Sequence, residues 1–397
     1  MLKYIQNKQV RLIHNTPLEF VRSFYLQKLQ SKNRLIGLVG QRGVGKTTLL
    51  LQYLKQNYSV SECLYFSADD VYIVDSSIYD IVDEFVKLGG KVVVIDEIHK
   101  YKNWASELKS IYDSFPNLLI RFSGSSMLNI INEKFDLSRR AVIKYVKPLS
   151  FREFFNLTNS ANIEPILLDD ILKNHNKLST DLALNYPKLY KSFKKYLQIG
   201  CYPFFLEDEQ EYKNKLFNAT QKIIYEDIPS INRIEYSHLS IFKKIIAKLI
   251  YAKVPLKVNI SALCKEFGIS HPTMLTYLDI LEQTKLIKAL KKHSKNISKK
   301  PDKLLFGNPN LLYTYADEFG FDVNIGTLRE TFFASCFDTI FYSDIGDFVV
   351  DNIIFEIGGK NKSFKQIKDI ENSYIVVDTD YTTTKNQIAL WLFGLIW

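Results

Sequence analysis

The sequence predicts an α/β fold whose first part is a parallel sheet flanked by helices, and three observations support it. An apolar run at residues 35–39 leads into a glycine-rich segment and then into a helix-like stretch at 48–54. A second apolar run, at 92–95, ends in two carboxylates, and a third, at 118–122, ends in serines and a glycine. Apolar runs without alternation are typical of strands buried on both faces, as in parallel sheets. We expect flanking strands at 63–66 and 142–146.

The glycine-rich segment fits the spacing G-x-x-x-x-G-K-[ST] of a phosphate-binding loop. Its residues are Gly40, Gln41, Arg42, Gly43, Val44, Gly45, Lys46, Thr47 and Thr48. Glycines let successive backbone N–H groups turn inward around phosphate oxygens, and the following helix N-terminus adds a favourable dipole. We expect Lys46 to reach the β- and γ-phosphates and the Thr47 hydroxyl to ligate Mg²⁺. The loop therefore predicts a nucleoside triphosphate site.

The two carboxylates, Asp96 and Glu97, follow a strand where open α/β sheets place their ligands. We expect Asp96 to hold Mg²⁺, directly or through water, and Glu97 to polarise the attacking water. The alternative is a strand that ends in a solvated acidic turn. Because the pair follows a phosphate-binding loop, we prefer the catalytic interpretation, and Glu97 favours hydrolysis over simple nucleotide binding.

Two further groups of polar residues are candidates for the same site. Ser123 and Ser125, after the third strand, could sense the γ-phosphate or hold the water, although an ordinary serine–glycine turn explains them nearly as well. Arg139 and Arg140 could supply an arginine finger, in the same subunit or in a neighbouring one. They could equally be solvated surface charges.

The length and composition describe a soluble protein of several domains. A chain of 397 residues is too long for one ordinary core. Hydrophobic residues make up 46% of it, yet no apolar stretch approaches the ~20 residues that span a bilayer, and no signal peptide begins it. We therefore expect a cytoplasmic protein without a membrane partner. Its four cysteines lack the paired spacing of a zinc site or a disulfide framework.

Four parts are expected along the chain. The nucleotide-binding part covers residues 1–150, and a helical linker or lid covers 151–235. Residues 236–307 show three short helical stretches, then a strand and a lysine-rich segment, which is the pattern of a winged helix-turn-helix. An α/β part covers 308–397.

The lysine-rich segment at 285–303 contains eight lysines and one acid, and it favours a nucleic-acid partner. The third helical stretch argues the other way, because its exposed face offers Asp279 and Glu282 and no cation before Lys285. A structural or protein-contact module is the slightly preferred interpretation. Double-stranded DNA, bound through this basic wing, remains the alternative.

Taken together, the motifs resemble those of bacterial and archaeal AAA-superfamily ATPases (AAA_14-type) that carry a C-terminal DUF4143 domain. The most specific segments are DEIHKYKNW at 96–104 and PLSFREF at 148–154, and the resemblance extends over nearly the whole chain. It implies an ASCE/AAA-type parallel sheet and ATP as the nucleotide. No Asn-Lys-x-Asp guanine-reading motif occurs in the sequence. Within the resemblance, Ser125 occupies the position of a post-strand serine, and Arg140 is the better arginine-finger candidate.

The same resemblance implies a small restriction-endonuclease-like α/β domain at the C-terminus. Glu330, Asp347 and Glu356 could fill its acidic positions and bind Mg²⁺ as a second site. The lysine expected two residues after Glu356 is absent, because Gly358 stands there, and Lys360 or Lys362 would have to replace it. A fold kept for stability or partner contact is therefore preferred over an active nuclease.

The sequence as a whole predicts a Mg²⁺-dependent P-loop ATPase that couples ATP binding and hydrolysis to a winged-helix and DUF4143-like output module, with DNA as one partner. The alternative is a signalling or scaffold ATPase that acts on a protein partner. An ATP-regulated nuclease is the third interpretation. A homo-oligomer is expected if Arg140 completes the site of a neighbouring subunit.

Overall fold

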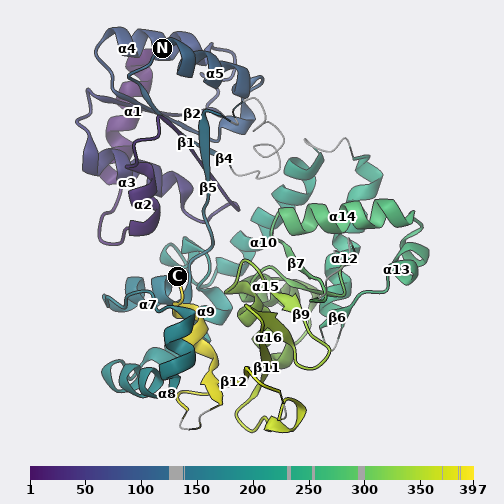
Figure 1. Ribbon diagram of the computed structural model, residues 1–397. Coiled ribbons are helices and arrows are strands. Elements are labelled where there is room, and N and C mark those ends of the chain that lie inside the picture. The colour runs from purple at the N-terminus through teal and green to yellow at the C-terminus, as the bar shows by residue number, and fades with distance from the viewer. Residues whose placement is uncertain are drawn as a thin grey trace. The chain divides into compact units, whose positions relative to one another are not determined.

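Figure 1 shows the computed structural model of the chain. The structure describes residues 1–124, 137, 139–229, 234–252, 255–293, 300–368, 370–382, 384 and 386–397. The chain forms two compact units, Met1–Pro148 and Leu149–Trp397, and each is described by itself.

The first unit contains a five-stranded, fully parallel sheet in the order β2-β3-β4-β1-β5. The strands are β1 (Leu35–Val39), β2 (Cys63–Ser67), β3 (Val92–Asp96), β4 (Leu119–Gly124) and β5 (Ala141–Tyr145). The predicted parallel sheet is therefore confirmed. All five residues of β1 and of β3 are buried, as expected for apolar runs covered on both faces.

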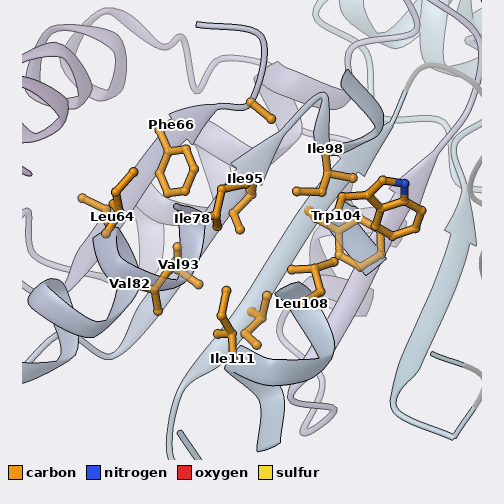
Figure 2. Close-up of a cluster of buried hydrophobic side chains, with 14 of the residues drawn as sticks. Leu64, Phe66, Ile78, Val82, Val93, Ile95, Ile98, Trp104, Leu108 and Ile111 are labelled. Atoms are coloured by element: carbon orange, nitrogen blue, oxygen red, sulfur yellow. The ribbon is translucent and has the colours of Figure 1, made fainter. Parts of the chain in front are cut away.

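Helices α1 (Leu2–Asn15) and α2 (Ser23–Leu29) precede β1. Between successive strands lie α3 (Lys46–Asn57), α4 (Ile78–Lys87) and α5 (Trp104–Ser114), with a short 3-10 helix, η1 (Ile98–Lys100), before α5. In α4 the buried positions Ile78, Ile81, Val82 and Phe85 recur at helical spacing and so form one apolar face. Figure 2 shows side chains of α4 and α5 pointing toward those of β2 and β3, which forms the core on one side of the sheet.

The second unit begins with helices. They are α7 (Phe151–Asn159), α8 (Leu168–Asn185), α9 (Leu189–Ile199), η2 (Pro203–Leu206), α10 (Tyr212–Lys222), a π-helical turn η3 (Ile223–Asp227) and η4 (Tyr236–His238). The helix α7 begins with a capping box, in which the Ser150 hydroxyl accepts from the Glu153 backbone N–H and the Glu153 carboxylate accepts from the Ser150 N–H.

Three helices and a small antiparallel sheet follow. The helices are α12 (Leu239–Tyr251), α13 (Ile260–Phe267) and α14 (His271–Gln283), and the strands β6 (Leu256–Lys257), β7 (Ile287–Leu290) and β8 (Lys303–Phe306) pair in the order β6-β8-β7. These elements lie within the segment for which a winged helix-turn-helix is expected.

The rest of the second unit is a mixed α/β arrangement. Helices α15 (Pro309–Phe319) and α16 (Ile325–Ser335) precede a sheet of order β13-β12-β11-β10-β9. Its strands are β9 (Phe341–Tyr342), β10 (Phe348–Val350), β11 (Ile353–Gly359), β12 (Ser373–Asp378) and β13 (Gln387–Ala389), with η5 (Phe364–Gln366) between β11 and β12. The chain ends with the buried 3-10 helix η6 (Leu390–Leu395), yellow in Figure 1, which contacts α7 and α8. Among the residues that the structure describes, we find no helix with the length and apolar character needed to cross a bilayer.

Candidate nucleotide site

The phosphate-binding loop joins β1 to α3, as predicted. Gly43 and Gly45 have φ values of 81° and 91°, a left-handed conformation that favours glycine, and Gly45 caps α3. Gly40 is required for a different reason, because a Cβ there would lie 2.5 Å from the Val146 carbonyl oxygen. The buried Lys46 ammonium donates to the carbonyl oxygens of Gly40 (3.1 Å) and Gln41 (2.9 Å), so it lies over the loop.

The Asp96 carboxylate, at the carboxyl end of β3, is the centre of the hydrogen bonds at this edge of the sheet. Its Oδ2 accepts from the Thr47 hydroxyl at 2.6 Å and from the Tyr65 hydroxyl at 2.9 Å. Its Oδ1 accepts from the Ser123 hydroxyl and from the Glu97 backbone N–H, the latter at 3.2 Å. The structure thus brings together the predicted Thr47, Asp96 and Glu97.

These oxygens fit the requirements of a magnesium ion. Mg²⁺ prefers oxygen ligands and is usually bound through one or two carboxylates and the phosphates of a substrate. Because the Thr47 hydroxyl donates a hydrogen bond to Asp96, the lone pairs of its oxygen remain available to a cation. Thr47 and Asp96 are therefore the residues that would hold Mg²⁺, which would supply positive charge to the phosphates.

Glu97 has a left-handed backbone conformation, with φ of 48°. Such conformations are costly for residues other than glycine and concentrate at functional sites. One carboxylate oxygen of Glu97 lies 3.6 Å from His99 Nε2, and the His99 side chain is buried. Burial lowers the pKa of His99 to about 3, and the positive charge of Lys100 acts in the same direction, so the imidazole is neutral near pH 7.

The two serine candidates have different outcomes. Ser125 lies outside the described residues. Ser123 is buried near the end of β4, where its hydroxyl donates to Asp96 and accepts from the Glu97 N–H at 3.1 Å. Tyr65 was missed by the sequence reasoning. The signal that could have found it is a polar tip in an otherwise apolar strand predicted in the same sheet.

Arg140 lies at the amino end of the parallel strands, opposite the carboxyl end where the phosphate-binding loop begins. It immediately precedes β5, whose first residue, Ala141, pairs with the start of β1 at Leu35, whereas the loop follows the end of β1. The strand length separates the two edges by about 13 Å at 3.3 Å per residue. Arg140 instead makes two hydrogen bonds to the Asp113 carboxylate, at 2.9 and 3.0 Å, and these lower the pKa of Asp113.

The three C-terminal acids lie near one another, but lysines neutralise them. The Lys303 ammonium on β8 pairs with Glu330 of α16 and lies 4.0 Å from Asp347, and Lys362 pairs with Glu356 of β11. Burial and the Asp347 charge raise the pKa of Glu330 to about 7. Among the described residues, no three His, Cys, Asp or Glu side chains form a group that could hold a metal ion. The arrangement thus differs from the expected Mg²⁺ site, because two ammonium groups face these carboxylates.

Lysines of the basic segment 285–303 also make internal contacts. Lys288 donates to the carbonyl oxygens of Ala334 (2.7 Å) and Phe337, and Lys292 pairs with Asp344. A backbone hydrogen bond adds to these contacts, because the Tyr342 N–H donates to the Lys291 carbonyl oxygen at 2.8 Å. With Lys303, three of the described lysines of this segment therefore contact residues 330–347 through their side chains. Residues 294–299, which include Lys295 and Lys299, lie outside the described part.

Residues 32–155 match the family model of an AAA domain. They form an AAA-type P-loop domain. The parallel sheet and the loop geometry agree with this assignment. Residues 190–319 match a domain of unknown function, DUF8612, whereas the sequence resemblance led us to expect DUF4143 for the C-terminal part.

Two similar proteins come from Methanocaldococcus jannaschii. The uncharacterized protein MJ1637 is 32% identical over 272 residues, which are 64% of this chain and 56% of the relative. The uncharacterized protein MJ1544 is 24% identical over 351 residues, which are 84% of this chain and 74% of the relative. The alignment thus spans little more than half the length of the first relative.

Two solved structures resemble the chain only loosely. A DNA replication initiation factor aligns at 17% identity over 68% of this chain and 91% of that chain, with a TM-score of 0.28. The Hsp104–ADP complex of S. cerevisiae aligns at 14% identity over 83% of this chain and 56% of that chain, with a TM-score of 0.32. Scores this low carry no functional inference for this chain.

Proposed function

We propose that the protein is a Mg²⁺-dependent ATP hydrolase. One observation carries the proposal: the Thr47 hydroxyl of the phosphate-binding loop bonds the Asp96 carboxylate, and Glu97 follows directly. Lys46 and the loop N–H groups would bind the phosphates, Thr47 and Asp96 would hold Mg²⁺, and Glu97 would polarise the attacking water. Ser123 supports this arrangement by bonding both Asp96 and the Glu97 backbone.

Phosphate release from ATP tests this function. Glu97→Gln keeps the shape of the side chain but removes the base, and general-base catalysis contributes about 10²–10⁴-fold, so turnover should fall by that factor while ATP still binds. Glu84→Gln, on the exposed face of α4, is the matched control and should keep the wild-type rate. A Glu97→Gln variant that hydrolyses ATP at the wild-type rate would contradict the proposal.

We further propose that Arg140 acts in the site of a neighbouring subunit and that the protein is a homo-oligomer when active. The position of Arg140 at the far edge of the sheet supports this, because its side chain cannot touch a nucleotide held by its own loop. The Asp113 carboxylate orients the guanidinium through two hydrogen bonds.

For the output half, we propose a winged helix and a DUF4143-like, restriction-endonuclease-like tail that acts on a protein partner. The internal contacts of Lys288, Lys292 and Lys303 support a protein partner over DNA, since these charges already face carbonyl oxygens and carboxylates. The exposed Asp279 on α14 is also a poor neighbour for phosphate.

The same hydrolysis assay distinguishes the partners. A protein-directed ATPase should turn over ATP at the same rate with and without double-stranded DNA at physiological salt. Stimulation by DNA that is lost when Lys291, Lys295 and Lys299 are changed to Glu would favour the DNA alternative.

A further inference from the structure

The Asp96 carboxylate is held from both sides of its strand. In the sheet order, β3 lies between β2 and β4, and each neighbour contributes one hydroxyl. Tyr65 of β2 donates to Oδ2 at 2.9 Å, and Ser123 of β4 donates to Oδ1. With Thr47 and the Glu97 N–H, four hydrogen-bond donors surround the Asp96 carboxylate.

The position of Tyr65 is itself determined by neighbouring elements. Its backbone N–H donates to Gln9 Oε1 of α1 at 2.7 Å, and the Gln9 amide donates to the Cys63 carbonyl oxygen at 3.0 Å. Gln9 is fully buried, so the outer edge of β2 is fastened to α1 at the residue that bonds Asp96. The Tyr65 hydroxyl therefore meets Asp96 from a strand that is hydrogen-bonded to Gln9 on one side and to β3 on the other.

Packing alone does not explain the hydroxyl. Tyr65 is 5% exposed, and a phenylalanine would fill the same apolar core without a polar atom. A buried hydroxyl is costly unless it is hydrogen-bonded, and the Tyr65 hydroxyl donates to the carboxylate that would hold the cation.

We propose that Tyr65 is a positioning residue of the cation site and that, together with Ser123, it fixes the Asp96 carboxylate in the orientation that holds Thr47. The proposal rests on the proposed nucleotide site, and it adds two residues that act on the metal through Asp96. Groups that orient metal-binding carboxylates typically change metal affinity about 10–100-fold when they are removed.

The test separates metal affinity from nucleotide affinity in the full-length protein. Mn²⁺ replaces Mg²⁺, and its binding to the protein saturated with ADP is measured by the loss of the free-ion electron paramagnetic resonance signal. ADP affinity is measured separately in EDTA. In Tyr65→Phe, Mn²⁺ affinity should fall about tenfold, whereas ADP affinity without metal should stay within about twofold of the wild type.

Two other variants complete the experiment. Tyr53→Phe removes another buried tyrosine hydroxyl, which bonds Tyr58, and should change neither affinity. Ser123→Ala should weaken Mn²⁺ binding in the same direction as Tyr65→Phe and provides the measurement if that variant does not fold.

The proposal would be overturned if Tyr65→Phe left the Mn²⁺ affinity unchanged. It would also be overturned if ADP affinity in EDTA fell by the same factor as Mn²⁺ affinity. If the wild type binds Mn²⁺ and ADP but does not hydrolyse ATP, the proposed hydrolase falls while the Mn²⁺ titration still decides the role of Tyr65. A wild type that binds no Mn²⁺ with ADP would overturn both.

Discussion

Arg140 offers the sharpest test of how the site is completed. Arg140 precedes Ala141, and the register of β5 on β1 places Ala141 four strand steps, or about 13 Å at 3.3 Å per step, from the end of β1 where the loop begins. If Arg140 acts on a neighbouring nucleotide, Arg140→Ala should lower turnover by about 10³-fold or more, the usual effect of an arginine finger. Lys46→Ala should also be inactive, because the phosphate-binding loop of the variant subunit no longer binds the phosphates.

Mixing the two inactive variants restores activity only if the arginine acts between subunits. In a 1:1 mixture, a competent interface needs an intact loop on one side and an intact Arg140 on the other. Random assembly places the two variants in that order at about a quarter of the interfaces of a cyclic oligomer. Phosphate release should therefore recover to about a quarter of the wild-type rate, far above either variant alone.

The reasoning is refuted if the mixture hydrolyses ATP no faster than the sum of its two components. Arg139→Ala is the matched control, because the neighbouring arginine is exposed, and it should keep the wild-type rate. The subunits must exchange during mixing. Exchange is complete when the phosphate-release rate of the mixture no longer changes with mixing time.

Three other predictions follow from buried charges. Arg121 is fully buried in β4, and its guanidinium donates to four carbonyl oxygens at 2.9–3.1 Å. Arg121→Met should therefore lower the free energy of opening of that strand, measured by hydrogen exchange, by about 3 kcal/mol. The exposed Arg139→Met should leave it unchanged. Because the pKa of Glu330 rises from 4.5 to about 7 in the fold, the folded state binds more protons between these values, and stability around α16 should fall as pH rises from 4.5 to 7. Glu330→Gln should flatten that profile, and an unchanged profile would show that another group titrates. No Mg²⁺-dependent DNA cleavage is expected, because Glu330, Asp347 and Glu356 form no metal-binding group among the described residues, and cleavage that Glu356→Ala removes would contradict this.

The fold of the first unit follows from local patterns. The loop spacing and the apolar runs at 35–39 and 92–95 lie within short stretches of chain, so they predict the strands, the loop and the helix, which is expected at 48–54 and extends over Lys46–Asn57. Thr47, Asp96 and Glu97 could be predicted for the same reason, because each stands at a defined step after its strand. The AAA-domain match extends over these residues without adding to their chemistry.

Partners that come from distant parts of the chain could not be predicted. From the sequence, Lys360 and Lys362 are both candidates for the cation beside Glu356, and the structure pairs Lys362 with it. No sequence pattern links Lys303 to Glu330, and its ammonium reaches that carboxylate from β8. In the same way, the sequence presented the lysines of 285–303 as one basic cluster, and folding directs Lys288 and Lys292 to different acceptors.

The sequence by itself determined the phosphate-binding loop, the strand that ends in Asp96 and Glu97, and the apolar faces that make a parallel sheet. Only the tertiary structure decided that Tyr65 and Ser123 share the Asp96 carboxylate and that Arg140 stands at the opposite edge. The physical reason is separation along the chain. Asp96 stands 31 residues from Tyr65 and 27 residues from Ser123, so their hydrogen bonds form only when β2, β3 and β4 pair, and Arg140 is placed only when β5 pairs with β1.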